Sequence, residues 1–416
     1  MRIAILTDRF PALSETFIEN QILSLLDLGI EVVILASGRG TAEITHAATR
    51  RILAEARIIY LPVPRPSRRR WLDLLGVLGR PRAALRVVGA LRRLGAAPGP
   101  YGVVRLIKAA TALAGQPMAF DHIFCHFAPN GDFGVWLRDT GLLSGRILTF
   151  CHGYDFSEVV QAHGAAIFER LFAEGDLFIA NTNYTRRRIL EIGAPAARTV
   201  TLPVGLFPSR FHYRVRYAAP DRPVRFFSIG RLVEKKGHAL ALHAFRQVLD
   251  AGIAAEFAIV GDGPLRAGLD ALIATLNLTE TVTLLGRRSQ EAVARQADDA
   301  DIFVLASTAS ASGDVEGQGL VLQEAQAMGL PVIASDHNGF PEGIRNGESG
   351  VLVPEGDIDA LATAMIELAR HPERWAPMGR AGRSFVREHF DQSRLTVELL
   401  GILGIGVAPS VPAQVA

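Results

Sequence analysis

Cysteines and long apolar runs are both scarce in this sequence. The 416 residues include only two cysteines, Cys125 and Cys151, which provide neither a disulfide framework nor a cysteine-rich metal site and fit a reducing compartment. No run of 18 or more apolar residues predicts a membrane-spanning helix, and the first apolar stretch (MRIAILTDRF) is too short for a signal peptide. The sequence therefore predicts a cytoplasmic protein.

An excess of one charge is also absent. The formal net charge is +2, from 44 basic and 42 acidic residues, so the overall charge gives no argument for a nucleic-acid partner. The length suits two domains that each bury a core. An aperiodic, proline-bounded stretch at about 206–222 separates them as a linker. We therefore expect one domain at 1–208 and a second at 222–390. An amphipathic end at about 391–405 and a flexible tail at 406–416 follow.

Strand and helix patterns alternate in both halves of the chain. Such alternation predicts an α/β fold with parallel sheets and crossover helices. The site of such a fold lies at the carboxyl ends of the strands. The expected strands are Arg2–Thr7, Glu31–Ala36, Asp121–His126, Ile147–Phe150, Leu177–Ala180, Val224–Ile229, Glu256–Val260, Val282–Leu285, Asp301–Leu305 and Pro331–Ser335.

The segment Ala306–Pro354 carries the most informative pattern. A polar loop ends in Glu-Gly-Gln-Gly at residues 316–319, and a helix is predicted over Leu320–Met328 because Gly329 and Pro331 end it. The first backbone N–H groups of a helix have no intrahelical acceptor and bind anions. The N–H groups of Gly319, Leu320 and Val321 are therefore candidates for holding phosphates.

Two carboxylates flank this loop-to-helix junction. Glu316 precedes the helix and Glu324 lies within it, so both are placed to accept hydrogen bonds from hydroxyls of one bound sugar-containing ligand. The alternative is that one acid stabilises the helix dipole and the other is a solvated side chain. The glycines around Glu316 and the apolar residues around Glu324 favour the binding interpretation.

The spacing Glu316…Glu324 within GDVEGQGLVLQEAQAMGLPVIAS resembles the donor-binding signature of retaining glycosyltransferases of family 4. The stretch Asp336–Asp357 (DHNGFPEGIRNGESGVLVPEGD) continues the resemblance. The resemblance implies a GT-B fold, in which two Rossmann-like domains, an N-terminal acceptor domain and a C-terminal donor domain, face each other across a cleft. It also implies that the last helix, at about 391–405, crosses back onto the N-terminal domain. It also implies a nucleotide-sugar donor, with Glu316 on the donor-sugar hydroxyls and Glu324 on the ribose.

The block GRLVEKKG at residues 230–237 resembles the phosphate-binding element of the same family. Gly230 lets the chain turn, and Arg231 and Lys236 are expected to stabilise the charge that develops on a departing diphosphate. Lys235 is expected on the surface. Family resemblance also makes Gly286 and Arg287 candidates for the nucleotide-base side. Because these cations and the helix N-terminus neutralise the phosphates, no metal and no other cofactor is expected.

In the first half, two histidines follow strand ends. His152 begins the sequence HGYD, which resembles the H-G-x-D element of family 4, whose histidine lies near the transferred sugar. Asp155 either orients His152 or binds hydroxyls, and Asn130 follows the strand that ends at His126. We place Asp155 and Asn130 on the acceptor side.

The first loop, DRFPALSE, resembles the opening of the colanic acid and amylovoran branch of the family. It makes Ser14 and Glu15 acceptor-side candidates. A plain helix cap by Ser14 is the alternative.

An arginine-rich insertion spans about residues 62–114. Arginines alternate there with Trp71 and several leucines, which is compatible with amphipathic helices on an anionic membrane. Helices that pack on the sheet with solvated arginines outside are an equal alternative. A nucleic-acid surface is disfavoured because the arginines lack interleaved stacking aromatics.

The combined prediction is a retaining hexosyltransferase. It would move a hexose from a UDP- or GDP-sugar to a hydroxyl of a lipid-linked oligosaccharide in exopolysaccharide biosynthesis. It would be cytoplasmic, with peripheral association at the inner face of the plasma membrane as an option. The main alternative is a catalytically silent GT-B subunit that binds sugar nucleotides or takes part in assembly. A GT-B epimerase or phosphorylase is a further alternative, and the phosphorylase is disfavoured because no cofactor lysine motif follows a strand. A dehydrogenase is disfavoured because no G-x-G-x-x-G follows the first strand.

Overall fold

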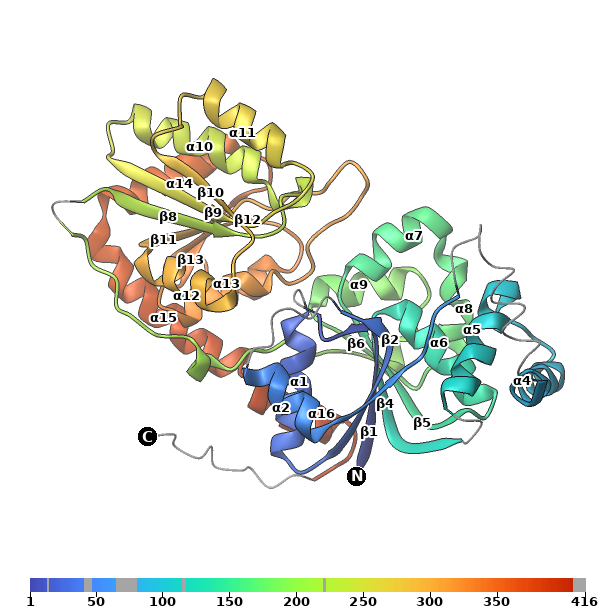
Figure 1. Ribbon diagram of the computed structural model, residues 1–416. Coiled ribbons are helices and arrows are strands. Elements are labelled where there is room, and N and C mark those ends of the chain that lie inside the picture. Colours follow the sequence, from blue (N-terminus) through green and yellow to red (C-terminus); the bar gives the residue numbers. More distant parts are fainter. Residues whose placement is uncertain (13–14, 41–46, 65–80, 114–116, 220–221, 407–416) are drawn as a thin grey trace.

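The computed structural model describes residues 1–12, 15–40, 47–64, 81–113, 117–219 and 222–406. Two Rossmann-like domains lie one above the other (Figure 1), each with a parallel sheet between layers of helices. The predicted α/β class is therefore confirmed.

The N-terminal sheet has seven strands in the order β3-β2-β1-β4-β5-β6-β7. Its neighbouring strands pair in parallel. The short strands β3 and β7 are absent from the sequence-based expectation. The strands are β1 (Arg2–Phe10), β2 (Glu31–Arg39), β3 (Arg57–Tyr60), β4 (Met118–His126), β5 (Leu143–Cys151), β6 (Leu177–Ala180) and β7 (Thr199–Thr201).

Helices cover both faces of this sheet, and each face has its own apolar core. Strands that are buried on both faces are continuously apolar. The central residues of β1 (Ile3–Leu6) and β2 (Val32–Ala36) show this pattern. One face carries α1 (Thr16–Asp27), α2 (Ala47–Glu55) and α16 (Gln392–Ile402). The other carries α4 (Pro81–Leu94), α5 (Gly99–Ala112), α6 (Ala128–Asp139) and α8 (Glu169–Glu174). The segments α7 (Glu158–His163) and α9 (Asn183–Glu191) complete the domain.

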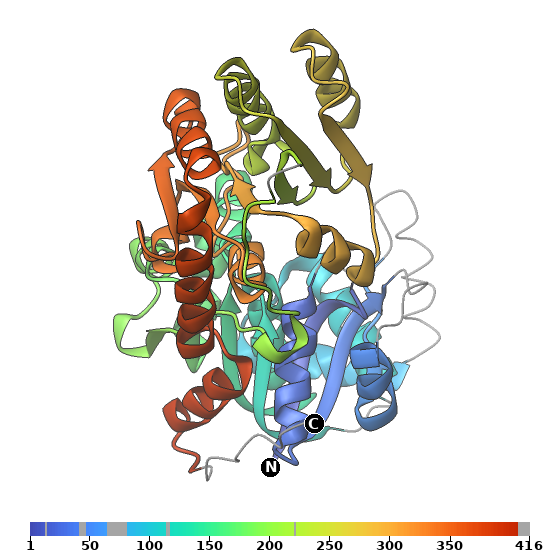
Figure 2. The same ribbon diagram turned by 90° about the vertical axis from the view of Figure 1, so that its left-hand side faces the viewer.

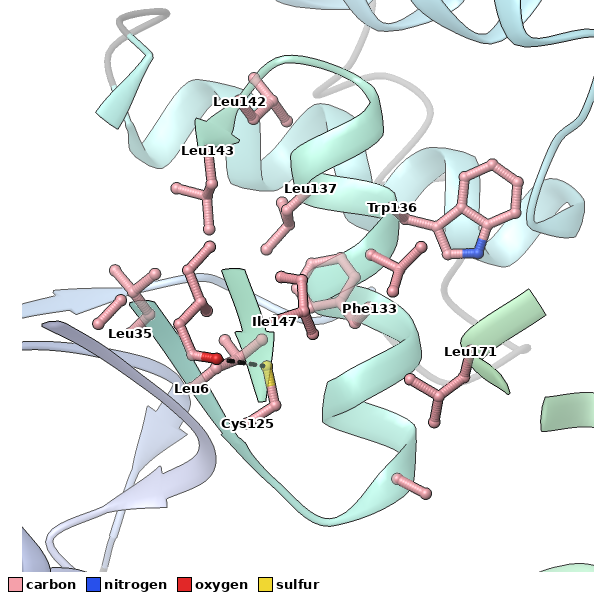
Figure 3. Packing of buried hydrophobic residues seen from close by; sticks show 14 of the residues in the cluster. Leu6, Leu35, Cys125, Phe133, Trp136, Leu137, Leu142, Leu143, Ile147 and Leu171 are labelled. Carbon is pink, nitrogen blue, oxygen red and sulfur yellow. Dashed lines mark hydrogen bonds between the residues drawn. The ribbon is translucent and has the colours of Figure 1, made fainter. Parts of the chain in front are cut away.

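The core beneath α6 is tightly closed around Cys125 (Figure 3). Its side chain is fully buried beside Leu6 and Ile147, and its Sγ donates to the carbonyl of Ile123 at 3.9 Å. A side chain at Gly134 would place Cβ 2.8 Å from that sulfur. Glycine therefore allows α6 to approach β4, the strand that ends at His126.

The arginine-rich insertion forms helices that pack on the N-terminal sheet. Val87 and Leu91 of α4 and Leu106 of α5 are buried in the domain core. On the opposite side of α4, Leu85 remains 72% exposed, and the side chain of Arg82 is also exposed. Residues 65–80, which include Trp71 and five of the arginines, lie outside the described residues. The apolar face of α4 therefore serves the fold, and an exposed leucine between arginines is what remains outside.

The C-terminal sheet has six strands in the order β10-β9-β8-β11-β12-β13, again paired in parallel. Its strands are β8 (Val224–Ile229), β9 (Ala255–Val260), β10 (Val282–Gly286), β11 (Ile302–Leu305), β12 (Val332–Asp336) and β13 (Gly350–Pro354). Its helices are α10 (His238–Asp250), α11 (Arg266–Thr275), α12 (Gln290–Asp299), α13 (Leu320–Ala327), α14 (Ile358–Arg370) and α15 (Trp375–His389). The short 3-10 turns η6 (Glu234–Lys236) and η7 (Phe340–Glu342) contribute to the site.

The chain crosses between the domains twice, and the two crossings lie side by side. The N–H of Leu206 donates to the carbonyl of Phe390 at 2.9 Å, and the N–H of Gln392 donates to the carbonyl of Leu206 at 2.8 Å. Beyond this point α16 packs on α1 of the first domain, as Figures 1 and 2 show. We call these two adjacent crossing segments, around Leu206 and Asp391, the hinge.

The expected linker is shorter than the sequence indicates. Arg216 lies within the predicted stretch of about 206–222, yet its side chain is fully buried and donates to the carbonyls of Ala297 and Met328. A buried guanidinium needs hydrogen-bond partners, and the C-terminal domain supplies them to Arg216. The chain around Arg216 therefore already packs on the C-terminal domain, and the linker between the domains ends before it. Among the described residues, no helix is both long and apolar enough to cross a membrane.

Candidate functional site

The loop after β11 enters α13 through Gly319. This residue has φ +69°, and an added Cβ would come 2.4 Å from Cε1 of Phe340. Glycine is therefore required both by the backbone conformation and by the close approach of the ring. The helix begins at Leu320, so its first N–H groups, including that of Val321, have no acceptor within the helix. The backbone therefore presents a helix N-terminus here, and phosphate binding by it stays a prediction.

Glu316 is held by two lysines. Its carboxylate lies 3.0 Å from Nζ of Lys236 and 3.5 Å from Nζ of Lys235. Burial acts to raise the pKa of Glu316, but the two ammonium groups outweigh it and hold the pKa below its ordinary value. Glu316 is thus a charged acceptor of hydrogen bonds at neutral pH.

The predicted surface position of Lys235 is wrong. Its side chain is 18% exposed, and its Nζ contacts Asp314 at 2.9 Å as well as Glu316. The physical reason is the loop after β11, which folds back over η6. The local sequence around Lys235 carries no sign of this distant segment.

Three residues that the sequence interpretation missed fix the backbone of Glu316. Its N–H donates to Nε2 of His337 at 3.2 Å, and its carbonyl accepts from Asn338 at 3.0 Å. Nδ1 of His337 in turn donates to Glu355 at 2.8 Å. The tautomer of His337 with its hydrogen on Nδ1 meets both demands, because Nε2 must be bare to accept from the peptide N–H. A histidine-asparagine pair directly after β12 is the signal that could have indicated this support.

Glu324 lies in α13, half-buried and near Lys236. Burial raises its pKa to about 7, and the nearby Lys236 only partly opposes the increase. A carboxylate with little solvent can be compensated by hydroxyl donors of a ligand. This environment fits the predicted ribose contact, which stays a prediction.

Replacing Glu324 by glutamine should stabilise the protein without ligand in a pH-dependent way. The unfolded chain releases the Glu324 proton near the ordinary pKa of 4.5, whereas the folded protein holds it until about 7. The wild type therefore loses stability relative to the variant as pH rises through this window. We expect nearly equal stability at pH 4.5 and an advantage of about 3 kcal/mol for Glu324→Gln at pH 8. Urea unfolding from pH 4.5 to 8 measures it, and a pH-independent difference would contradict the buried-carboxyl interpretation.

The other predicted donor-side residues lie at the carboxyl ends of β8 and β10. The aliphatic part of Lys236 lies over Gly230, where an added Cβ would be 3.0 Å from Cδ of the lysine. Gly286 has φ +70° and its carbonyl accepts from the N–H of Gly261. Arg231 and Arg287 are exposed. The glycines therefore build the loops, and the roles of the two arginines remain predictions.

In the N-terminal domain, His152 is the outer member of a hydrogen-bonded chain. Its Nε2 lies 3.1 Å from Nδ1 of His126, whose Nε2 lies 3.0 Å from Oε1 of Gln21. The amide oxygen of Gln21 can only accept, so Nε2 of His126 carries the hydrogen. Nδ1 of His126 then accepts from Nε2–H of His152, which leaves Nδ1 of His152 bare.

Both histidines are neutral. Burial lowers the pKa of His152 to about 3 and that of His126 well below its ordinary value, the latter also because of its neighbour. The ring of His152 is held by Phe17 and Phe127, with centroids 4.7 and 4.8 Å away. Gln21 and His126 therefore set which nitrogen His152 can offer to a ligand. The HGYD motif that predicted a role for His152 gave no indication of its partners His126 and Gln21.

Asp155 orients the loop of His152 and is fully buried. Its carboxylate accepts from the N–H groups of His152, Gly153 and Ala128, at 3.2, 3.0 and 3.0 Å. Burial raises its pKa to about 6, and the N–H donors act against that increase. Of the two predicted roles, the geometry therefore favours orientation. A sugar hydroxyl would have to displace one of these donors.

Asn130 is also fully buried, and its amide donates to the carbonyl of His126 at 2.9 Å. It therefore supports the histidine strand end from behind, which is a correction to its predicted place on the acceptor side. A contact with an acceptor would need an exposed amide.

The first loop differs from the predicted cap. The helix α1 begins at Thr16 with Glu15 at the N-cap position and without a side-chain cap hydrogen bond. Ser14 lies outside the described residues, so its predicted role is neither supported nor opposed. Burial, together with the negative charge of Asp8, raises the pKa of Glu15 to about 7. Glu15 remains an acceptor-side candidate.

The residues from the two domains meet directly. An added Cβ on Gly317 would be 2.6 Å from the carbonyl oxygen of His152, and one on Gly153 would be 3.3 Å from Cα of Gly317. The loop that carries Glu316 therefore lies against the loop that carries His152. Among the described residues, no group of three histidine, cysteine, aspartate or glutamate side chains is arranged to hold a metal ion. Metal independence remains a prediction.

Known proteins resemble this chain in sequence and in architecture. Residues 14–210 match the family described as Glycosyltransferase Family 4, and residues 209–385 match Glycosyl transferases group 1. The chain is 33% identical over 409 residues to the putative colanic acid biosynthesis glycosyltransferase WcaL of Salmonella typhimurium, covering 97% of this chain and 99% of that protein. It is 34% identical over 408 residues to the amylovoran biosynthesis glycosyltransferase AmsK of Erwinia amylovora, with the same coverage.

The structure of Anabaena HepE in complex with UDP-glucose superposes with a TM-score of 0.71 at 17% identity, covering 97% of this chain and 99% of that one. At this identity the likeness concerns the fold.

Proposed function

Because this chain belongs to glycosyltransferase family 4 and has the GT-B fold, we propose that it transfers a hexose from a nucleotide-diphosphate sugar with retention of configuration. The observation that carries the proposal is the contact of Glu316 with Lys236 beside the first turn of α13, directly opposite His152. One carboxylate, one cation and a helix N-terminus are the groups that a sugar diphosphate requires.

The diphosphate would lie over the first turn of α13 and near Lys236. As the bond between the anomeric carbon and the phosphate oxygen breaks, negative charge grows on the departing oxygen. A fixed ammonium group and helix N–H groups stabilise that charge more in the transition state than in the ground state. These groups supply the neutralisation for which a metal would otherwise serve.

The acceptor hydroxyl would attack from the face on which the diphosphate leaves. The new bond joins the acceptor oxygen to the anomeric carbon, and the acceptor proton passes to the departing phosphate oxygen. This step needs no separate protein base. Glu316 would hold the sugar hydroxyls and Glu324 the ribose, while the bare Nδ1 of His152 can accept a hydrogen bond from a sugar hydroxyl.

The acceptor would be a lipid-linked oligosaccharide of exopolysaccharide biosynthesis. Support comes from WcaL and AmsK, which are named for colanic acid and amylovoran biosynthesis and match nearly the full chain. A lipid-linked acceptor lies at a membrane, and the outer side of α4 presents Leu85 beside the exposed Arg82. An exposed apolar residue among cations fits an anionic lipid surface.

The experiment is a ligand-shift melting panel of UDP-, GDP-, ADP- and dTDP-sugars, with and without EDTA, on the wild type and on Glu324→Ala. Ligand that binds only the folded protein raises its melting temperature by mass action. We expect one nucleotide sugar to stabilise the wild type but not the variant, with no effect of EDTA. No shift from any sugar would contradict the donor assignment and favour a silent assembly subunit that binds no sugar nucleotide.

The same donor, radiolabelled, is then offered with polyprenyl-diphosphate-linked oligosaccharide in anionic or neutral vesicles. We expect faster transfer in the anionic vesicles, and NMR of the product should show the donor's anomeric configuration. An inverted product would exclude retention, and equal rates in both vesicles would exclude the membrane contribution.

A further inference from the structure

Glu342 forms a direct contact between the two domains. It ends the turn η7 of the C-terminal domain, and its two carboxylate oxygens accept from the backbone N–H groups of Asn183 at 2.8 Å and Tyr184 at 3.0 Å. These two N–H groups belong to the first turn of α9 in the N-terminal domain. The contact spans 159 positions of sequence.

This contact completes the amino end of α9. Thr182, the N-cap residue, accepts from the N–H of Thr185 through its own hydroxyl at 3.0 Å. The remaining first-turn donors, at Asn183 and Tyr184, are satisfied by Glu342. A carboxylate is the preferred partner there, because the N–H groups and the helix dipole both favour negative charge. One domain therefore supplies half of a helix cap to the other.

Glycines on the C-terminal side permit this approach. An added Cβ on Gly339 would come 2.5 Å from Cγ2 of Thr182, the residue that caps α9. Gly317 likewise lies against the carbonyl of His152. Two close approaches between the domains thus occur at glycines near Glu342 and Glu316.

The amino end of α9 is also linked to His152. Asn181, which precedes α9, donates from its amide to the carbonyl of His152 at 3.3 Å and accepts from the hydroxyl of Thr185 at 2.8 Å. Fixing α9 therefore fixes the carbonyl against which Gly317 packs. Near the hinge, Gln318 exchanges two hydrogen bonds with Val204, each 2.8 Å, and anchors the same loop.

We propose that Glu342 is a positioning residue for the transfer: by binding the amino end of α9, it holds the domains closed with the Glu316 loop against His152. This inference rests on the proposed function, because it assigns Glu342 to the alignment of the donor loop with the residues of the opposite domain. Opening at the hinge would expose the N–H groups of Asn183 and Tyr184 to water. The closed state is therefore favoured by two charge-assisted hydrogen bonds.

The test measures the distance between the domains directly. Spin labels on Ala173→Cys and Ala271→Cys report it, since both positions are exposed and lie in different domains. The two native cysteines are fully buried and free, so labelling is confined to the introduced sites. We expect a narrow distribution for the parent protein. In Glu342→Ala we expect a longer, broader one, with the closed-to-open ratio lowered about tenfold, as the loss of one or two such bonds implies.

A second variant removes the donor from the other domain. Proline is favourable at the first position of a helix, so Asn183→Pro deletes one N–H donor while the helix keeps its conformation. Its extended predecessor, Thr182, tolerates a following proline. We expect the same opening as in Glu342→Ala, to a smaller extent. Glu342→Gln should be intermediate because it retains an acceptor oxygen without charge.

The matched control is Glu348→Ala, which removes an exposed glutamate from the loop before β13 and should leave the distances and rates unchanged. With a donor in hand, Glu342→Ala should lower kcat about tenfold and leave melting in the absence of ligand close to that of Glu348→Ala. An unchanged distance distribution in Glu342→Ala would overturn the proposal. Absence of any transfer by the parent protein would instead overturn the proposed function, because the distances are read without a substrate.

Discussion

Replacing Lys236 by alanine should lower kcat/KM by about 100- to 1,000-fold, the range found when one group that stabilises transition-state charge is removed. The Lys236 ammonium lies 3.0 Å from Glu316, with the stem of the side chain over Gly230. In the proposed reaction the same ammonium faces the departing diphosphate. Without this ammonium, the negative charge that develops on the diphosphate loses a stabilising cation. Glu316 also loses its nearest ion-pair partner. Steady-state transfer with the donor found by the melting panel measures the effect.

The matched control is Lys235→Ala, one position earlier. Lys235 contacts Asp314 at 2.9 Å and reaches Glu316 only at 3.5 Å, so its loss should cost less than tenfold. Lys235 keeps Glu316 charged in the Lys236 variant, which separates the loss at the diphosphate from a change in Glu316 ionisation. Equal losses in the two variants would show that the lysines act only as a shared positive field.

Replacing Asp155 by alanine should lower the free energy of unfolding by about 3 kcal/mol. The buried carboxylate accepts from three backbone N–H groups, and each orphaned buried donor costs about 1 kcal/mol or more. The loop at His152 and the first turn of α6 would lose their common acceptor. Urea unfolding measures the difference, and an unchanged dependence of the unfolding free energy on urea concentration shows that only stability has changed.

An exposed aspartate provides the comparison. Asp270 pairs with Arg266 on the surface of α11 at 2.9 Å, and its replacement by alanine should cost no more than about 0.5 kcal/mol. A loss below about 1 kcal/mol in Asp155→Ala would mean that solvent or another group takes over the three donors. In that case Asp155 could not be the residue that orients His152.

Much of the donor side could be predicted because its chemistry is local. Glu316, Gly319 and Glu324 lie within nine positions of one another, and the strand-loop-helix pattern around them fixes their relative placement. Gly319 is required by a backbone conformation that is a property of that residue itself. The family resemblance and the residue chemistry therefore led to the same segment.

The parts that could not be predicted depend on distant segments. Lys235 was expected on the surface because nothing near it in sequence indicates Asp314, 79 positions later. His126, expected only to follow a strand end, is bonded to Gln21 across 105 positions. Asp155 had two possible roles, and only the positions of Ala128 and the His152 loop distinguish them.

The two parallel sheets, the helix start after Gly319 and the acidic pair beside it could be predicted, because they follow from short-range backbone preferences and apolar patterning. The lysine that faces Glu316, the bare nitrogen of His152 and the contact of Glu342 with α9 are visible only in the folded protein. These features are contacts between elements far apart in the chain. Their geometry exists only after both sheets have packed and the two domains have met.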